Sequence, residues 1–538
     1  MTRTAVVIGA GIAGLASAGL LAREGFEVTL LEQNARIGGR AGLLERDGFR
    51  FDTGPSWYLM PEVFEHFFEL MGTSAAQQID LQWLDPGYRI FPEPDGDGPA
   101  QVVTVPHGHR AVRELFERLE AGSGPALDAY LASACATTRM AREHFLYNPF
   151  TRWSTLLAPE LLRSAPALAG ALTSSLDRYI ARRFANPVLR QLLGYPAVFL
   201  GTEPRRAPAM YHLMSALDLG GGVGYPRGGF FRLMECCQRL AEQAGARIRL
   251  GARVESILTT RTARRRPRVS GVRWVDASGV AHVEQAEVVV SAADLHHTET
   301  ALLPRGLRSY PERWWHRRTS GPGAVIVMLG VRGALPELAH HSLFFARDWP
   351  ANFDAVFGRP PHVPSPASSY VCRVSASEES MSPPGQENLF VLVPVPAEES
   401  IGRGGADGAG DPRVEAAADA AIAMISRWAG IPDLRERITL RQTIGPADYV
   451  RQFNSWHAGM LGPAHTLRQS ALFRGRNVSR KVGGLYYAGG TTLPGVGLPM
   501  CLISAEIVLK LIRGDNSAGP LPPGARPGVS HGAGTEQR

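Results

Sequence analysis

The fold is decided near the amino terminus, by Ala5-Val6-Val7-Ile8-Gly9-Ala10-Gly11-Ile12-Ala13-Gly14. A short β-branched run stops at Gly9, and the residues from Ile12 to Glu24 follow with helical spacing and small side chains. A second apolar run, from Glu27 to Leu31, comes directly after that helix. A strand, a helix and a strand within about thirty residues predict a parallel βαβ unit. We therefore predict an α/β protein built around a Rossmann-like nucleotide-binding domain.

The glycines of this stretch match the G-x-G-x-x-G pattern, in the strand-to-helix context that gives the pattern its meaning. Gly9 permits the tight turn, Gly11 lets the backbone approach a pyrophosphate, and Gly14 lets the helix pack closely on the strand. Ile12 and Ala13 begin the helix, where free amides and the positive helix end favour phosphate. The pattern alone is weak in a chain with 59 glycines, so it needs support from other residues.

That support comes from Glu32, which ends the second strand. A carboxylate at this place accepts hydrogen bonds from the ribose hydroxyls of an adenosine. The same charge would repel a 2′-phosphate. Glu32 therefore favours an unphosphorylated adenosine ribose and disfavours NADP.

A second glycine pair follows the acid, in Ile37-Gly38-Gly39-Arg40-Ala41, and Gly48-Phe49-Arg50-Phe51-Asp52-Thr53-Gly54-Pro55 comes next. Gly38 and Gly39 offer further backbone contacts near the phosphates, and Arg40 can neutralise the pyrophosphate. The arrangement resembles that of flavoproteins with two dinucleotide-binding domains, and Gly54 and Pro55 belong to the expected site. The resemblance implies FAD as the cofactor, in preference to NAD or to an empty structural fold.

The strand and turn from Ala246 to Val254 look like the segment that covers the adenine in such flavoproteins. Val254 would contribute backbone contacts to the adenine. The alternative interpretation is an ordinary surface hairpin. The sequence does not decide between the two.

Near the carboxyl end, a strand-like run ends in a glycine pair, and Thr491 to Pro499 then opens a helix that runs from about Met500 to Ile512. Such a turn exposes free amides, which suit the ribityl-phosphate region and the pyrimidine edge of a flavin. Negative charge develops on that edge when a flavin is reduced, and the positive helix end favours it. The predicted contacts here are Gly489, Gly490, Gly497 and Leu498.

The composition is that of a globular protein, with 44% hydrophobic and 20% charged residues. The formal net charge is +7, but the basic residues are scattered and match no recognition motif, so we expect no nucleic-acid partner. The five cysteines show no CxxC pair and no metal-ligand spacing, so we expect reduced thiols. No apolar run reaches the roughly 18 residues of a membrane span, and Met1 to Thr4 lead straight into the first strand. We therefore expect a cytoplasmic protein without a targeting peptide.

Two domains and a tail are expected. Residues 1–60, 221–300 and 440–513 carry the nucleotide motifs and the strand-like runs, and are predicted to form a discontinuous FAD-binding domain. Residues 61–220, which are mainly helical in pattern, and 301–439 are predicted to form an α+β substrate domain that also faces the membrane. Residues 514–538 are rich in Gly, Pro and polar residues and are predicted to be a disordered tail.

From Thr4 to about Ile512, the chain resembles the bacterial phytoene desaturase family, whose fold is similar to that of the amine oxidases. The most specific features are the amino-terminal segments above and T-x-P-G-x-G-x-P over Thr492 to Pro499. Shorter matching segments are Tyr225–Phe230, Leu338–His341, Val391–Pro396 and Pro446–Tyr449. The resemblance implies an FAD-dependent oxidoreductase that desaturates a long isoprenoid hydrocarbon by hydride transfer to the flavin. It implies phytoene as the substrate, a more conjugated carotene as the product, and a quinone or oxygen as the electron acceptor.

A long hydrocarbon substrate is held by burial, at about 0.8 kcal/mol per methylene, and the same effect holds it in a bilayer. We therefore expect a peripheral enzyme on the inner face of the cell membrane. The candidate docking region is Phe145 to Tyr195, where apolar residues recur at helical spacing beside several arginines. The alternative is that this apolar stripe belongs to the core of the substrate domain.

The sequence determines no catalytic residue. Asp448 and His341 lie in family-like segments and are weak candidates for proton handling, with a structural role as the alternative for each. His340 and His341 have no third ligand at metal spacing, so no metal site is predicted.

Other functions on the same fold stay open. The run Ala488-Gly489-Gly490-Thr491-Thr492 lacks the acid often found after the first glycine in amine oxidases, which disfavours amine oxidation. A carotene cis–trans isomerase and a carotenoid oxygenase are enzymatic alternatives. A prenyl- or lipid-binding protein of the Rab-escort type, without redox activity, is an alternative that the intact phosphate and ribose motifs disfavour.

Overall fold

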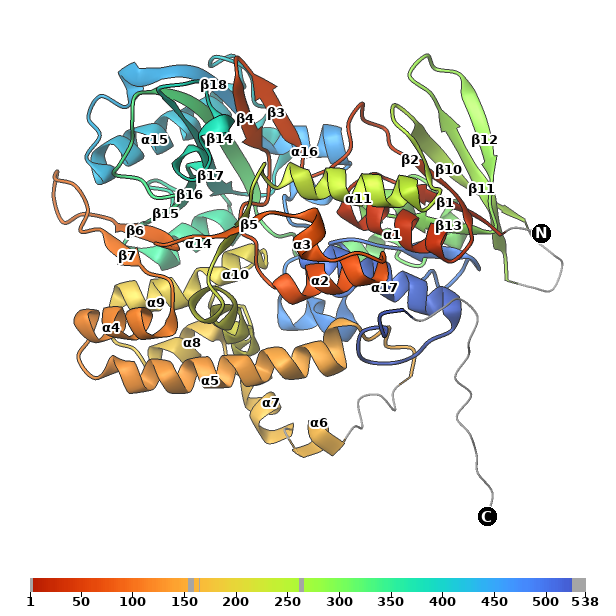
Figure 1. Ribbon diagram of the computed structural model, residues 1–538, viewed down its shortest axis with the longest axis horizontal. Coiled ribbons are helices and arrows are strands. Elements are labelled where there is room, and N and C mark those ends of the chain that lie inside the picture. Colours follow the sequence, from red (N-terminus) through yellow and green to blue (C-terminus); the bar gives the residue numbers. More distant parts are fainter. Residues whose placement is uncertain (1–2, 153–158, 164, 261–265, 525–538) are drawn as a thin grey trace.

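The computed structural model describes residues 3–152, 159–163, 165–260 and 266–524. Its two main sheets lie on either side of the molecule, and helices fill the space around and between them (Figure 1). The chain enters each sheet several times, so neither sheet is built from one continuous part of the sequence.

A parallel sheet of five strands carries the predicted nucleotide-binding unit. Its order is β19 (Leu485–Tyr487), β13 (Val288–Ser291), β1 (Thr4–Ile8), β2 (Glu27–Leu31) and β9 (Arg247–Arg249). Every neighbouring pair is parallel. The central strands are covered on both faces, which is why β1, β2 and β13 are continuous apolar runs without alternation.

Helix α1 (Ile12–Arg23) packs between α11 (Phe231–Gln243) and α17 (Leu498–Arg513). Eleven residues of α1 are buried, and its small side chains let these helices approach. A three-stranded antiparallel sheet adds to this domain, with β10 (Arg253–Thr260), β11 (Arg268–Val275) and β12 (Ala281–Gln285). The helices that follow the amino-terminal and carboxyl-terminal glycine motifs, α1 and α17, therefore pack against each other.

The second sheet has seven strands, in the order β18 (Ile438–Ile444), β14 (Gly323–Arg332), β17 (Gln386–Val395), β16 (Ser369–Cys372), β15 (His341–Phe345), β6 (Tyr88–Pro92) and β7 (Val103–Val105). Successive side chains along each strand point to opposite faces of this sheet. Val325 and Val327 pack in one core with helix α15 (Pro412–Ala429). Ile326 and Met328 point the other way, into the core shared with the nucleotide-binding domain.

A layer of helices lies below the second sheet (Figure 1). It contains α4 (His109–Leu119), α5 (Ser123–Ala141), α6 (Pro159–Arg163), α7 (Ala165–Thr173), α8 (Leu176–Ala181), α9 (Pro187–Gly194) and α10 (Pro196–Phe199). The remaining strands and α-helices are β3 (Leu43–Arg46), β4 (Phe49–Asp52), α2 (Pro61–Leu70), α3 (Ala75–Gln78), β5 (Leu81–Trp83), β8 (Gly224–Pro226), α12 (Leu295–Thr300), α13 (Glu312–Trp315), α14 (Trp349–Phe357) and α16 (Pro446–Phe453). None of the described helices is both long and apolar enough to cross a membrane.

Two expected boundaries differ from the structure. The boundary at residue 440 falls inside β18, which pairs with β14 and so belongs to the second sheet. The tail expected to be disordered from residue 514 is packed in its first part, because the buried Lys510 Nζ donates to the carbonyls of Ser517 and Gly519. Leu521 is buried as well, and its amide donates to Glu506. The rest of that tail, residues 525–538, lies outside the described residues.

The glycine turn at the start of α1 generates a stability prediction. A Cβ on Gly14 would lie 1.8 Å from the Gly9 carbonyl oxygen, so Gly14→Ala must displace the strand-to-helix turn. We expect it to lower the free energy of unfolding by about 3 kcal/mol or more and to reduce the FAD content of the purified protein. Thermal unfolding and flavin absorbance measure the two effects.

The matched control is Gly96→Ala, because a Cβ on Gly96 meets no atom within 4 Å. This control should unfold at the wild-type temperature. A Gly14→Ala protein with wild-type stability and FAD content would contradict the packing role of Gly14.

Candidate functional site

A single large cavity, of about 710 Å³, is lined by residues from both sheets and from both ends of the chain. Fifteen of the sixteen predicted cofactor residues line it: Gly9, Gly11, Ile12, Ala13, Glu32, Gly38, Gly39, Arg40, Gly54, Pro55, Val254, Gly489, Gly490, Gly497 and Leu498. Gly14 is the exception, because it is buried against the turn below. The structure thus brings the amino-terminal segment, Val254 and the carboxyl-terminal segment to one place.

The amino-terminal turn leaves backbone amides facing this cavity. Gly9 has a φ of +97° and its amide donates to Leu31 O at 2.8 Å, which ties the turn to β2. Gly11 caps α1 without a side-chain hydrogen bond, and only Gly38 O, at 4.0 Å, comes near the position of its missing Cβ. The first turn of α1 is therefore open to an anionic group, as a pyrophosphate requires.

Glu32 is held in one orientation beside this turn. Its Oε2 accepts from the Ala10 amide at 2.7 Å, and its Oε1 accepts from the backbone and side-chain nitrogens of Asn34, both at 2.8 Å. Glu32 is buried and still lines the cavity. Two carboxylate oxygens offer about four acceptor positions, so the fixed carboxylate can also accept from a ribose.

The carboxyl-terminal turn is organised by a buried amide and a hydroxyl. Asn477 Nδ2 donates to Tyr487 O and Leu493 O, at 3.1 and 3.0 Å. Ser504 Oγ accepts from the Gly489 amide at 2.9 Å. Gly497 then caps α17 with a φ of +115° and no side-chain hydrogen bond. The amides at the start of α17 are therefore also free to meet an electron-rich group.

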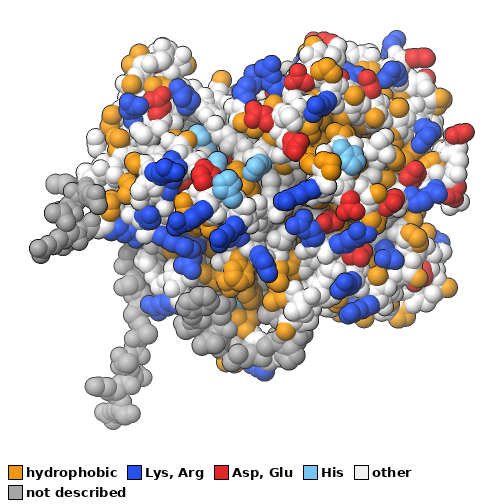
Figure 2. Space-filling model, turned by 180° about the vertical axis from the view of Figure 1, so that it is seen from behind, with side chains coloured by type: hydrophobic (Ala, Val, Ile, Leu, Met, Phe, Trp, Pro, Cys, Tyr) orange, Lys and Arg blue, Asp and Glu red, His pale blue; other side chains and the backbone are white. Residues whose placement is uncertain are grey.

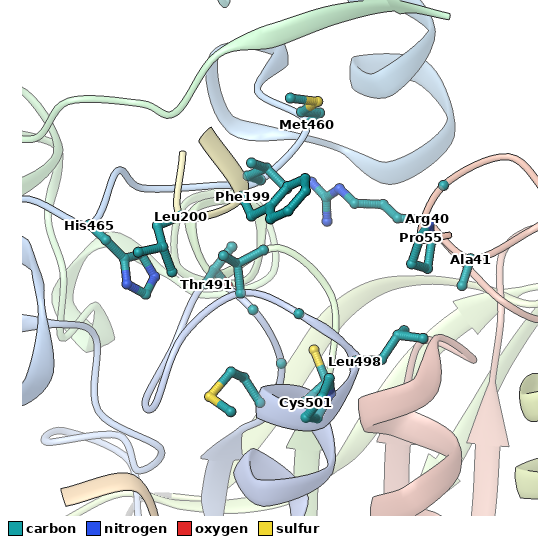
Figure 3. A pocket seen from close by; sticks show the side chains of 18 of the residues that line it. Arg40, Ala41, Pro55, Phe199, Leu200, Met460, His465, Thr491, Leu498 and Cys501 are labelled. Atoms are coloured by element: carbon teal, nitrogen blue, oxygen red, sulfur yellow. The ribbon is translucent and has the colours of Figure 1, made fainter. Parts of the chain in front are cut away.

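Arg40 reaches into the pocket with its guanidinium toward Phe199 (Figure 3). One guanidinium nitrogen donates to Ser455 Oγ, and the same nitrogen lies 4.0 Å from the Asp294 carboxylate. Its buried Nε has no hydrogen-bond partner. A buried donor without a partner is unfavourable, so this side chain fits a site that is completed by an anionic cofactor.

Beyond the glycine turns, the cavity wall is apolar and aromatic. Trp57 forms part of it and stacks on His341, with ring centroids 4.7 Å apart and an interplanar angle of 17°. Tyr195 and Phe199 lie at 5.9 and 5.6 Å from Trp57. The second sheet supplies Ile326 and others from its inner face, namely Leu343, Phe390 and Leu392. This part of the cavity suits a hydrocarbon.

The two weak catalytic candidates do not line the cavity. Asp448 accepts from the amides of Gly404 and Gly445, at 2.7 and 3.0 Å, and so caps α16. His341 lies behind Trp57, and its Nδ1 pairs with Tyr370 Oη at 2.7 Å. Burial holds the pKa of His341 well below its usual value. The geometry therefore gives both side chains structural contacts instead of contact with a substrate.

His340 and His341 have a neighbour that sequence spacing did not indicate. Cys372 lies opposite His341 on β16, and one ligand atom from each of the three residues falls within 4.8 Å of the others. Burial lowers the pKa of His340 to about 3 and raises that of Cys372 to about 12. Structural zinc sites take four protein ligands, and in the described part of the chain only these three group together. We assign the group no metal.

The predicted docking stripe lies partly inside the molecule. Leu161 and Leu176 are buried, and Leu172 lines the cavity. Trp153, Leu156 and Leu157 fall outside the described residues. The arginines of this region that the structure describes are exposed at its surface: Arg163, Arg178, Arg182, Arg183 and Arg190.

Sequence reasoning missed Arg474 and Asn477, which hold the carboxyl-terminal turn from behind. It also missed Tyr370, whose ring lines the cavity while its hydroxyl binds His341 and Ser56. None of these residues lies in a recognisable motif. Only their contacts with distant segments reveal what they do.

Comparisons with known proteins agree with this geometry. The model of the family described as flavin containing amine oxidoreductase matches residues 12–508. The chain belongs to this family. It is 39% identical to a carotenoid 3,4-desaturase of Haloarcula japonica, over 93% of this chain and 96% of that protein. It is 32% identical to a zeta-carotene-forming phytoene desaturase of Myxococcus xanthus, over 94% and 93% of the two chains.

Solved structures support the fold alone, because their sequence identities are low. Putrescine oxidase bound to putrescine has a TM-score of 0.56 at 14% identity, covering 95% of this chain and 99% of that one. Cyclohexylamine oxidase from Brevibacterium oxydans also has a TM-score of 0.56, at 15% identity, with 95% and 100% covered. The predicted family resemblance, the Rossmann-like fold and the FAD cofactor are confirmed, and the chain is an FAD-dependent oxidoreductase.

The fixed carboxylate of Glu32 generates a binding prediction. Glu32→Gln keeps the shape of the side chain and removes its charge. The new side-chain NH2 group would also face an N–H donor, either that of Ala10 or those of Asn34, where the carboxylate now accepts. A hydrogen bond to a charged group contributes about 1.5–3 kcal/mol, so we expect FAD to bind about 10- to 100-fold more weakly. Titration of the apoprotein with FAD measures the change.

Glu27→Gln, on the same strand but exposed and away from the cavity, is the control and should leave FAD affinity unchanged. Equal FAD affinity for Glu32→Gln and the wild type would show that Glu32 does not contact the cofactor.

Proposed function

We propose that this chain desaturates a long isoprenoid hydrocarbon of carotenoid biosynthesis, with phytoene or a partly desaturated carotene as the substrate. The observation that carries the proposal is the single cavity, in which the FAD-binding turns continue into a long apolar wall. Relatives that match more than nine-tenths of the chain are named as carotenoid desaturases. The cavity supplies the two things that such a reaction needs, a place for a flavin and a dry place for a hydrocarbon.

The substrate offers no heteroatom to a nucleophile or an acid, so its binding depends on burial and shape. Burial contributes about 0.8 kcal/mol per methylene, which an apolar wall of this extent can supply along a long chain. When bound, FAD supplies a hydride acceptor. The substrate loses a hydride from one carbon and a proton from the neighbouring carbon, and the electrons of the second C–H bond form the new double bond.

The protein's own residues orient the chain and exclude water. Trp57 is fixed between His341 and the rings of Tyr88, Tyr195 and Phe199, so this wall is rigid. A rigid wall holds a reacting carbon at one place beside the flavin, and this positioning lowers the entropic part of the barrier. We infer that the residues around Trp57 select which bond of the chain is oxidised.

The rim of the cavity supports the membrane part of the proposal. Leu467 and Phe473 line the cavity and are 42% and 52% exposed, so the cavity opens at an apolar rim. The neighbouring Arg468 is also exposed. Basic side chains beside exposed apolar ones gather in the lower half of the face shown in Figure 2. Such a surface suits the anionic inner face of a cell membrane, where substrate and a quinone acceptor would both be available.

The activity is tested by mixing the FAD-loaded protein without oxygen with phytoene, or with a conjugated carotene, in liposomes. We expect the flavin absorbance to bleach while a more conjugated product forms, one flavin for each new double bond. Adding a quinone or air should restore the oxidised flavin, and the faster of the two identifies the acceptor.

Other outcomes point to other functions. A product that keeps the hydrogen count of its substrate indicates an isomerase, and a product that contains oxygen indicates an oxygenase. A flavin that stays oxidised, with no product from any carotene, would contradict the proposed desaturation.

Membrane docking is tested on the apolar rim. We expect Leu467→Asp with Phe473→Asp to weaken sedimentation with anionic phospholipid vesicles at least tenfold, because burying each apolar side chain contributes about 1.5–3 kcal/mol. Val280→Asp with Val283→Asp is the matched control, since both valines are 53% exposed, Val283 on β12 and Val280 in the turn just before it. Equal vesicle binding by the rim variant and the wild type would place the docking surface elsewhere.

A further inference from the structure

The guanidinium of Arg474 is buried directly behind the carboxyl-terminal FAD-binding turn. Its side chain is only 4% exposed. Nε donates to Thr492 O at 3.0 Å, and the two terminal nitrogens donate to Pro463 O at 3.1 Å and Gly490 O at 2.6 Å. Gly490 also lines the cavity. Arg474 therefore holds the Gly490–Thr492 turn from the side opposite to the cavity.

Among the described residues, this cation has no counter-ion. All three of its acceptors are neutral carbonyls, and no carboxylate of the described residues lies within 4.0 Å of it. Arg373 and Arg441, which are also largely buried, each face a glutamate, at 2.8 and 2.5 Å. A buried charge is strongly unfavourable unless it is paired. An anion bound near Arg474 would therefore be stabilised by it.

The titratable groups around Arg474 do not supply that partner. Burial raises the pKa of Tyr211 and raises that of Cys501 to about 11, so both are neutral at pH 7. Burial and the nearby Arg474 hold the pKa of His465 well below its usual value, so His465 is neutral as well. Arg318 is a second cation. The pKa of Arg474 itself falls to about 10, which leaves it charged at pH 7.

The cavity is where an anion can reach this charge. Thr491 belongs to the turn that Arg474 holds, and it lines one part of the pocket together with His465 and Cys501 (Figure 3). The uncapped start of α17 adds its positive end to the same place. Both features favour negative charge on a group bound there, and a flavin carries more negative charge when it is reduced.

We propose that Arg474 is a positioning residue that raises the reduction potential of the bound FAD, by placing an unpaired positive charge behind the Gly490–Thr492 turn. It acts on the cofactor through this turn. A more oxidising cofactor suits the removal of hydride from an unactivated hydrocarbon. The inference rests on FAD binding and does not depend on which carotenoid is the substrate.

The test compares Arg474→Met with the wild type as FAD-loaded proteins without substrate. Equilibration with a reference dye during anaerobic reduction gives the potential of the flavin. We expect Arg474→Met to shift the equilibrium at least tenfold toward oxidised flavin, which for a two-electron couple lowers the potential by about 30 mV. Sulfite, which forms an anionic adduct with oxidised flavins, should bind at least tenfold more weakly.

The control is Arg308→Met, because Arg308 also donates to two backbone carbonyls, those of Thr300 and Leu303. Neither of these two residues lines the cavity, whereas Gly490, an acceptor of Arg474, does. The control variant should keep the wild-type potential. Arg474→Lys keeps the charge without the three hydrogen bonds, so we expect a near-wild-type potential with a more easily lost cofactor. A purely structural Arg474 would instead give Lys and Met variants with the same potential.

A measurement on the wild type covers the case in which Arg474→Met does not retain FAD. The absorbance spectrum distinguishes anionic from neutral reduced flavin, and we expect the anionic form at pH 7. Neutral reduced flavin in the wild type, or an Arg474→Met protein with an unchanged potential, would overturn the inference.

Discussion

The structure depends on how closely two glycine turns, from opposite ends of the chain, can approach one cofactor. Gly9 and Gly489 take φ values of +97° and +114°, which side chains rarely tolerate. Gly14 leaves no room for a methyl group. These positions let α1 and α17 begin at the same cavity and pack against each other along their lengths. We infer that a larger residue at either turn would separate the helix ends from the phosphates and the ring of a bound FAD.

The division of the molecule into two sheets follows from the two kinds of contact that its cavity must make. The parallel sheet presents backbone amides and the fixed carboxylate of Glu32, which suit a charged dinucleotide. The seven-stranded sheet presents the alternate residues of β14 and β17, such as Ile326 and Leu392, which suit a hydrocarbon. Its opposite face is closed by α15. One cavity therefore joins a polar end to an apolar end.

Features that depend on spacing along the chain could be predicted from the sequence. The βαβ unit, the glycine turns and the acid at Glu32 are local patterns, and all of them meet at the cavity. Only part of the role of Asp448 could be interpreted in this way, because one of its two amide donors, Gly445, is three residues away but the other, Gly404, lies in a distant loop. Arg474 was not recognised either, since an arginine without a motif shows its role only when its acceptors are known. The boundary at residue 440 failed for the same reason, because pairing of β18 with β14 is a contact between distant segments.

The most direct test of the account is an experimental structure of the protein with FAD and a saturated isoprenoid that cannot react. The account predicts the adenosine ribose against Glu32, the flavin ring against Gly490, and the hydrocarbon against Trp57 and Leu392 in the same cavity. A hydrocarbon bound in a separate cavity, or a flavin ring remote from the carboxyl-terminal turn, would contradict it.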